Sequence, residues 1–238
     1  MQVIEKTYLF LFKNALRAVN PVKKRIIRTE CRVHQFINNQ AVIIMKNDGL
    51  DEASKMMSTY IHALNAGVVW ADQDFKSSNH FYNPVTERGL FGNSNAKKEC
   101  RSYYKIALKE YFKGHTKRAM FYLGAACHLI QDLTVPQHAN VRLLNNHRSY
   151  EKWVLSAYRH YDEYKIYYGG IYLSSLRLYI HLNSRKAIQT YLRYSSIRDR
   201  YLRYYKITSV ILALAQRTTA GLMLKFYHDI HRISLYHV

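Results

Sequence analysis

The stretch from Phe121 to Glu151 constrains this chain most, because it holds five side chains that can bind zinc. They are His128, Asp132, His138, His147 and Glu151. The first two and the last two form pairs spaced four residues apart, so the members of each pair point the same way on a helix. The middle histidine follows Pro136, near which a helix is expected to end. The stretch therefore predicts two helices joined by a turn.

The types of side chain favour a metal centre. Imidazole nitrogen and carboxylate oxygen are ordinary zinc ligands, and catalytic zinc sites combine them with an open position for water. A single His-x-x-x-Asp pair is more often structural in a chain with 12 His. Five suitable side chains within one helix-turn-helix favour a catalytic cluster of more than one metal ion.

The same stretch, HLIQDLTVPQHAN followed by HRSYE, resembles the signature of the bacterial zinc-dependent phospholipase C family. In that family a His-x-x-x-Asp helix precedes Pro-x-His-Ala and then His-x-x-x-Glu. Further matches are the Ala71-Asp72 step, the HFYNP segment that begins at His80, and AQRTTAGLMLKFYHDI, which ends at Ile230. The resemblance spans about residue 30 to residue 232, and it extends to a superfamily that includes single-strand nucleases.

The resemblance implies an all-α fold, a single compact multi-helix domain around a zinc cluster, and two to three zinc ions. It also implies that Asp72 orients or deprotonates the attacking water and is the candidate catalytic residue. Clustered zinc ions lower the pKa of a bridging water and neutralise charge in an in-line displacement. The implied ligands are Asp72, His80, His128 and Asp132 for one zinc, His138, His147 and Glu151 for a second, and His34 with Asp132 for a third.

The chain departs from the family pattern at two places. Family members begin at a Trp, a short way before the first His, whose amine and carbonyl bind the third zinc. Residues 21–33 contain no Trp here, and Trp70 and Trp153 lie elsewhere. Either another group substitutes, or that zinc binds weakly, or the protein works with two metals or none. The aromatic residue that often follows the loop Asp is replaced by Gln73, so a choline headgroup is not predicted.

The predicted function is hydrolysis of a phospholipid phosphodiester to diacylglycerol and a phosphorylated headgroup. One alternative is a single-strand nuclease-type phosphodiesterase, with nucleic acid the less favoured substrate. Another is a degenerate, non-catalytic basic protein that binds membranes or nucleic acid. The net charge of +20 suits an anionic membrane surface, nucleic acid or a solvated exterior. We expect a monomer.

The length of 238 residues fits one domain, and only 9 Gly and 3 Pro favour long helices. We predict a basic amphipathic lead over residues 1–30, which can lie on a membrane surface, and the phospholipase C-like helical domain over residues 31–238. Three scattered cysteines form no disulfide framework and suit a reducing compartment. Helices are predicted over residues 34–45, 51–67, 95–113, 116–133, 149–165, 171–192 and 196–232.

The sequence shows no clear signal peptide. The apolar run from Tyr8 to Phe12 is too short to span a membrane, no convincing cleavage site follows it, and no run of about 18 apolar residues occurs elsewhere. We therefore expect a cytoplasmic or membrane-associated protein, although the family it resembles is mostly secreted. We also expect no C-terminal β-sandwich of the kind that some toxins of the family carry.

Overall fold

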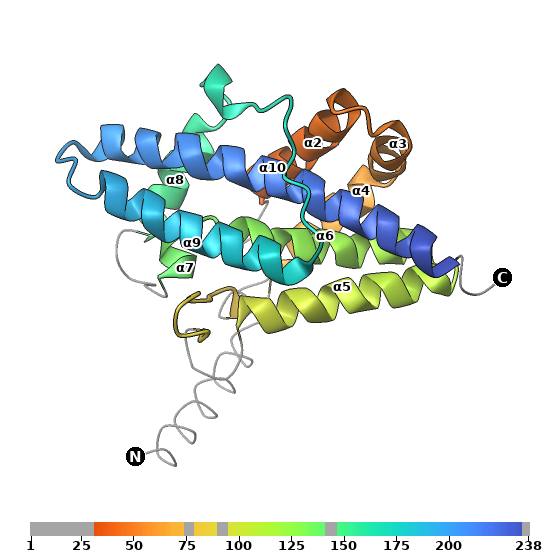
Figure 1. Cartoon of the computed structure of the whole chain (residues 1–238). Helices are drawn as coiled ribbons and strands as arrows, with labels where there is room; N and C mark the ends of the chain where they lie inside the picture. The colour runs from red at the N-terminus through yellow and green to blue at the C-terminus, as the bar shows by residue number, and fades with distance from the viewer. Residues whose placement is uncertain (1–30, 74–78, 90–94, 141–146, 235–238) are drawn as a thin grey trace, which may run out of the picture.

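The computed structural model describes residues 31–73, 79–89, 95–140 and 147–234, and every regular element in these ranges is a helix (Figure 1). The predicted all-α class is therefore confirmed for this part of the chain, while the predicted lead over residues 1–30 lies outside it. The elements are α2 (Arg32–Asn47), α3 (Asp51–Thr59), α4 (Ile61–Ala71), α5 (Ala96–Phe112), α6 (Thr116–Asp132), α7 (Pro136–Ala139), α8 (His147–Ala157), the 3₁₀ helix η2 (Asp162–Tyr164), α9 (Leu176–Tyr194) and α10 (Arg200–Ser234).

Helix α6 is central because α4 and α5 both pack along it. Two glycines make the α4–α6 crossing close. A Cβ on Gly67 of α4 would lie 1.8 Å from the carbonyl oxygen of Phe121, and a Cβ on Gly124 of α6 would lie 2.0 Å from that of Leu64. Each helix thus presents a hydrogen atom where any other residue would place a methyl group against the opposing backbone. This crossing fixes the position of the helix that carries the predicted ligand pair.

Helix α10 crosses the molecule beside its antiparallel neighbour α9 and packs against α2 and α6 (Figure 1). It is long and apolar enough to span a membrane, but 78% of its most apolar window is buried in the protein. The buried Gln216 amide donates to the Tyr164 carbonyl oxygen at 2.7 Å and accepts from the Ile166 N–H at 2.9 Å. Helix α10 is therefore a core helix, and its buried Gln216 holds the segment that contains Tyr164 and Ile166.

Four predicted helix boundaries were wrong. One is the start at residue 196, because α10 begins at Arg200. The segment 51–67 is two helices that meet at Tyr60, and Gly67 ends neither of them because its role is the close crossing with α6. The predicted helix over residues 149–165 ends at Ala157, before η2. Residues 171–175 are not helical, because Ser175 is an N-cap whose side chain accepts from the Leu178 N–H.

Candidate metal centre

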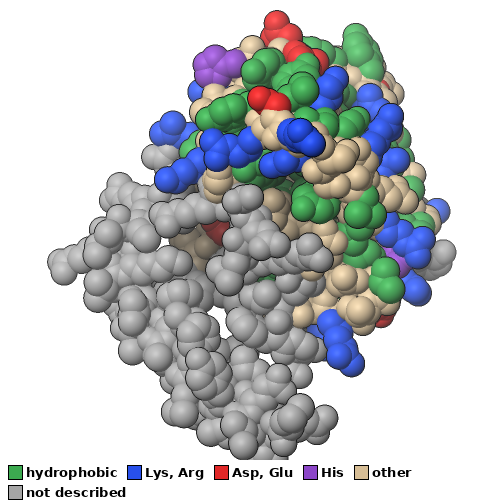
Figure 2. All heavy atoms as spheres, turned by 90° about the vertical axis from the view of Figure 1, so that its left-hand side faces the viewer, with side chains coloured by type: hydrophobic (Ala, Val, Ile, Leu, Met, Phe, Trp, Pro, Cys, Tyr) green, Lys and Arg blue, Asp and Glu red, His purple; other side chains and the backbone are tan. Residues whose placement is uncertain are grey.

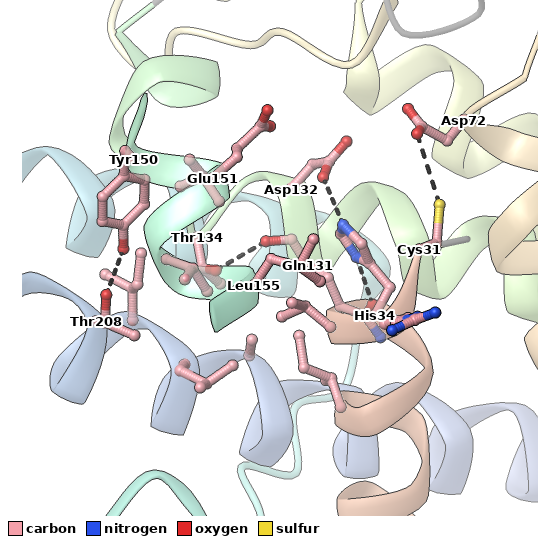
Figure 3. A pocket seen from close by; sticks show the side chains of 18 residues that line it. Cys31, His34, Asp72, Gln131, Asp132, Thr134, Tyr150, Glu151, Leu155 and Thr208 are labelled. Atoms are coloured by element: carbon pink, nitrogen blue, oxygen red, sulfur yellow. Dashed lines mark hydrogen bonds and ion pairs between the residues drawn. The ribbon is translucent and has the colours of Figure 1, made fainter. Parts of the chain in front are cut away.

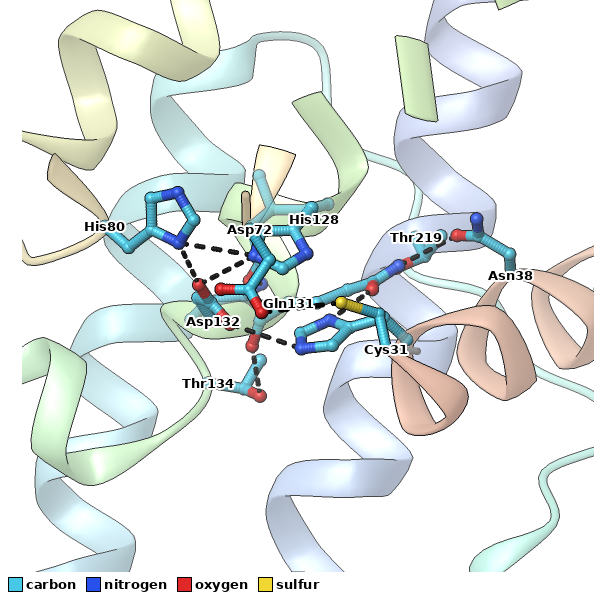
Figure 4. Close-up of polar contacts among 12 residues, drawn as sticks. Cys31, Asn38, Asp72, His80, His128, Gln131, Asp132, Thr134 and Thr219 are labelled. Carbon is cyan, nitrogen blue, oxygen red and sulfur yellow. Dashed lines mark hydrogen bonds and ion pairs between the residues drawn. The ribbon is translucent and has the colours of Figure 1, made fainter. Parts of the chain in front are cut away.

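Asp132, the last residue of α6, is the centre of a cluster of three imidazoles (Figure 4). Its Oδ2 atom lies 2.7 Å from His80 Nδ1 and 3.1 Å from His128 Nε2. Its Oδ1 atom lies 3.4 Å from His34 Nε2. His128 Nε2 and His80 Nδ1 are themselves 3.2 Å apart. Ring nitrogens and carboxylate oxygens thus converge on one small volume.

Separate segments of the chain supply these side chains. The α6 pair lies one helical turn apart, as the i,i+4 spacing predicts. His34 comes from the first turn of α2 and stacks on the His128 ring, with 4.3 Å between ring centroids. His80 lies in the loop after α4, and this loop is held to α7 because the Tyr82 N–H donates to the His138 carbonyl oxygen at 3.1 Å.

Asp72 joins the cluster from the C-terminal end of α4. One ligand atom each from Asp72, His80 and His128 lie within 4.8 Å of one another, and the same holds for His34, His128 and Asp132. The structure therefore brings together the side chains that the family resemblance implies for the first zinc and for the third. Their role as zinc ligands is a prediction from the family resemblance.

The ligands predicted for the second zinc are only partly described. His138 is buried in the short helix α7 and stacks on Phe81 with 4.7 Å between ring centroids. Glu151 lines the same cavity as Asp132, and both carboxylates extend toward one side of it (Figure 3). His147 is the first residue of α8, and its side chain lies outside the described part of the structure. The helix that carries it begins where the sequence predicts a ligand pair.

The cluster shifts the pKa values of its own members. Burial opposes ionisation of Asp132, but the neighbouring His128 and His138 and hydrogen bonds from His128 and His80 hold the pKa of this carboxyl well below its usual range. Burial and the adjacent His128 lower the pKa of His34. Burial and the charge of Asp132 raise the pKa of Asp72. At neutral pH, His34 thus favours the neutral form that binds metals.

Gln131, which the sequence analysis missed, orients His34 from behind. His34 donates its Nδ1–H to Gln131 Oε1 at 2.9 Å, which leaves Nε2 facing Asp132. The Gln131 Nε2 group donates to Asn38 Oδ1 at 2.9 Å and to Thr219 Oγ1 at 3.1 Å. Metal-binding histidines commonly donate their second N–H to such a partner. A glutamine beside a predicted ligand carries no signal in the sequence, because its partners come from α2 and α10.

The cluster opens into a cavity of about 600 Å³ (Figure 3). His34, Asp72 and Asp132 lie along one part of its lining. The remainder is largely apolar and comes from α2, α7–α8 and α10. Its members include Val33, Ile37, Val135, Val154, Ile211 and Leu212. The cavity therefore has the potential metal ligands His34, Asp72 and Asp132 on one part of its lining and apolar side chains that suit an apolar ligand on the rest.

The donor set fits zinc. Histidine nitrogen and carboxylate oxygen are its usual ligands in catalytic sites, and each of the two groups has three of them. His80 Nδ1 and His128 Nε2 face one another and the same carboxylate oxygen, so three potential ligand atoms lie within about one hydrogen-bond length of each other. A cation between these atoms would satisfy the lone pairs of both rings.

Comparison with known proteins gives matches of sequence and of structure. The family model described as zinc dependent phospholipase C matches residues 33–199. The phospholipase C of Clostridium novyi is 26% identical, over 84% of this chain and 59% of its own length. That of Clostridium perfringens is 24% identical, over 83% of this chain and 58% of its own length. The chain thus spans less than two thirds of the curated relatives it matches.

The fold has a solved counterpart. The alpha toxin from Clostridium absonum superposes with a TM-score of 0.72 at 20% sequence identity, covering 83% of this chain and 63% of the toxin. The likeness supports the helical arrangement, and the match to the family model runs from the start of α2 through the whole of α9 and includes the cluster that these helices position.

Proposed function

Since the chain belongs to the zinc-dependent phospholipase C family, we propose that it hydrolyses phospholipids to diacylglycerol and a phosphorylated headgroup. The observation that carries the proposal is the position of the Asp132 cluster beside apolar walls. A phospholipid has a phosphodiester next to an apolar glycerol ester, and the cavity offers a chemical counterpart to each part. The headgroup itself is not specified by these contacts.

The residues divide the work between metal binding and proton transfer. Asp72, His80, His128 and Asp132 would hold one zinc ion, His34 and Asp132 another, and His138, His147 and Glu151 a further one. Bound zinc would supply a water of lowered pKa and neutralise charge on the phosphate. Asp72 would orient or deprotonate the attacking water, since its carboxylate lies beside His80 and His128 in the cluster.

A membrane surface belongs to the same proposal, with the protein acting as a monomer. The end of the molecule where α9 meets α10 exposes Leu192 (66%), Tyr201 (59%) and Leu202 (47%). Exposed Arg198 and Arg200 lie between them in sequence. Figure 2 views this end and shows basic side chains interspersed with hydrophobic ones. Such a surface can insert apolar groups while its cations meet anionic lipid headgroups.

The two alternative functions are less well supported. The relatives that match are phospholipases C, so the single-strand nuclease activity is not favoured. A non-catalytic protein would have no need of five candidate ligands from separate segments within one buried cluster. Absence of bound metal in the test described next would favour the non-catalytic alternative.

The test uses the full-length chain prepared without chelator. We expect two to three zinc ions per chain by elemental analysis and release of phosphorylated headgroups from mixed phospholipid vesicles. His128→Ala should lose zinc and hydrolysis together, while His160→Ala, at an exposed position, should keep both. Folded wild-type protein that binds no zinc would refute the proposed function. Hydrolysis of single-stranded nucleic acid but not of phospholipid would refute the assigned substrate.

A further inference from the structure

We propose that Cys31 is a thiolate ligand of the metal centre, at the end formed by His34 and Asp132. The inference rests on the proposed function, because it assumes that the cluster binds metal. It answers a question raised by the sequence, which lacks the tryptophan expected before the first histidine. The described tryptophans, Trp70 and Trp153, line no part of the cavity.

The position of Cys31 in the fold is the first support. It is the N-cap residue of α2, and His34 is the third residue of that helix. Side chains at the N-cap and N3 positions lie next to each other over the first helical turn. Cys31 does not cap the helix with its side chain, and its backbone has a left-handed φ of 44°. The side chain instead lines the cavity together with His34 and Asp132.

The contact made by the sulfur is the second support. Cys31 Sγ donates to Asp72 Oδ2 at 3.5 Å, and in Figure 3 it is directed toward that carboxylate. Asp72 is itself within 4.8 Å of His80 and His128 through its ligand atoms. The thiol is therefore attached to the cluster by a direct contact. Its neighbour in the contact is one of the predicted zinc ligands.

The small number of ligands assigned to the third ion is a third, separate reason to expect another ligand there. His34 and Asp132 are the only side chains assigned to the third ion, whereas catalytic zinc sites usually have three protein ligands. His128, whose ligand atom lies within 4.8 Å of those of His34 and Asp132, is assigned to the first ion. A sulfur ligand from the turn before His34 would raise the number of protein ligands for this ion from two to three.

The thiol must lose its proton before the sulfur can bind a metal ion. Burial and the carboxylates of Asp72, Asp132 and Glu151 raise the pKa of Cys31. Binding of a divalent ion would release that proton to solvent as the sulfur–metal bond forms.

The other two cysteines provide matched controls. Cys100 and Cys127 are buried in the hydrophobic core, and Cys100 donates to the Ala126 carbonyl oxygen. Cys31 is the one cysteine of the three that is partly exposed. The double variant Cys100→Ala/Cys127→Ala would retain Cys31 as its only cysteine.

The experiment is zinc X-ray absorption spectroscopy on full-length protein, with a phosphine rather than a thiol as reductant. Wild-type protein and the double variant should both show a sulfur neighbour at about 2.3 Å beside nitrogen and oxygen at about 2.0–2.2 Å. Cobalt-substituted samples of both should show thiolate-to-cobalt charge-transfer absorption. Cys31→Ser should lose the sulfur neighbour and the absorption, and should bind one metal ion fewer per chain.

Several results separate this inference from the proposed function. Zinc-loaded, active wild-type protein with only nitrogen and oxygen neighbours would overturn the role of Cys31 and leave the phospholipase function standing. Folded wild-type protein without zinc would overturn both. A sulfur neighbour that persists in Cys31→Ser would also overturn the assignment. If Cys31→Ser does not fold, the double variant still decides, because its only thiol is Cys31.

Discussion

Replacing Gln131 by leucine tests whether the buried amide network holds His34 in its metal-binding orientation. Gln131 is 1% exposed, and its side chain makes three hydrogen bonds, to His34, Asn38 and Thr219. Leucine is close to glutamine in size but offers neither a donor nor an acceptor. His34 Nδ1 would lose its acceptor, and the ring could then rotate or change tautomer.

The structure sets the expected magnitude. Leaving one buried polar group unpaired costs about 1–3 kcal/mol, so three groups, on His34, Asn38 and Thr219, would cost about 3–9 kcal/mol. The His34 side chain is 21% exposed, so water recovers part of its share, and we expect the lower half of that range. Loss of a partner behind a metal-binding histidine typically lowers metal affinity by about 10–100-fold.

The assay combines urea unfolding of chelator-treated protein with zinc titration against a competing chelator. Thr219→Val is the matched control, because it removes a different hydrogen bond of Gln131 and leaves the contact with His34 intact. It should destabilise the protein by about 0.5–1.5 kcal/mol and keep the zinc affinity. A folded Gln131→Leu protein with unchanged zinc affinity would refute the orienting role of this residue.

Three further predictions concern other parts of the molecule. Folding raises the pKa of Asp72, so ionisation of this carboxyl destabilises the metal-free protein as the pH rises above the unfolded value of about 3.9. Asp72→Asn should therefore raise the melting temperature of metal-free protein at pH 7 but not at pH 3. An equal effect at both pH values would contradict the pKa shift. Gly124→Ala should lower the free energy of unfolding by about 1–3 kcal/mol in urea titrations, because the added Cβ would overlap the Leu64 carbonyl oxygen. Unchanged stability would disprove the close crossing of α4 and α6. Leu192→Ser should weaken sedimentation with anionic vesicles, whereas Leu178→Ser, about 21 Å away along α9, should not; equal effects would argue against a membrane-contacting end.

The sequence predicts the helices well where hydrophobic periodicity and end signals agree. Helices α5 and α6 begin and end within about one residue of their predicted limits, and Gly114 with a φ of 81° separates them as predicted. Gly67 was misread because the same residue type can end a helix or permit a close helix crossing. The choice depends on the partner helix, which local sequence does not contain.

The side chains of the candidate metal centre could likewise be predicted only in part from the sequence. The spacing of His128 and Asp132 places them on one face of a helix, and the family resemblance adds His34, Asp72 and His80 from other segments. The structure brings these five side chains together, although nothing in their individual surroundings in the sequence marks them. Cys31 and Gln131 were not predicted, since a scattered cysteine and a lone glutamine match no spacing rule. Their positions depend on how α2 and α10 pack against α6.

The wide separation in sequence of the clustered side chains has a consequence for how the chain reaches its folded state. Apart from the pair on α6, the contacts of the cluster join residues that are 41 to 98 positions apart, from Cys31 with Asp72 to His34 with Asp132. An unfolded chain cannot hold these groups together, so a metal ion would bind the folded form almost exclusively and act as a reversible cross-link between α2, α6 and the intervening loop. At a free zinc concentration one hundred times the dissociation constant, this selective binding would add about 2.7 kcal/mol to the free energy of unfolding. Zinc supply would then govern how long the protein survives as well as whether it is active.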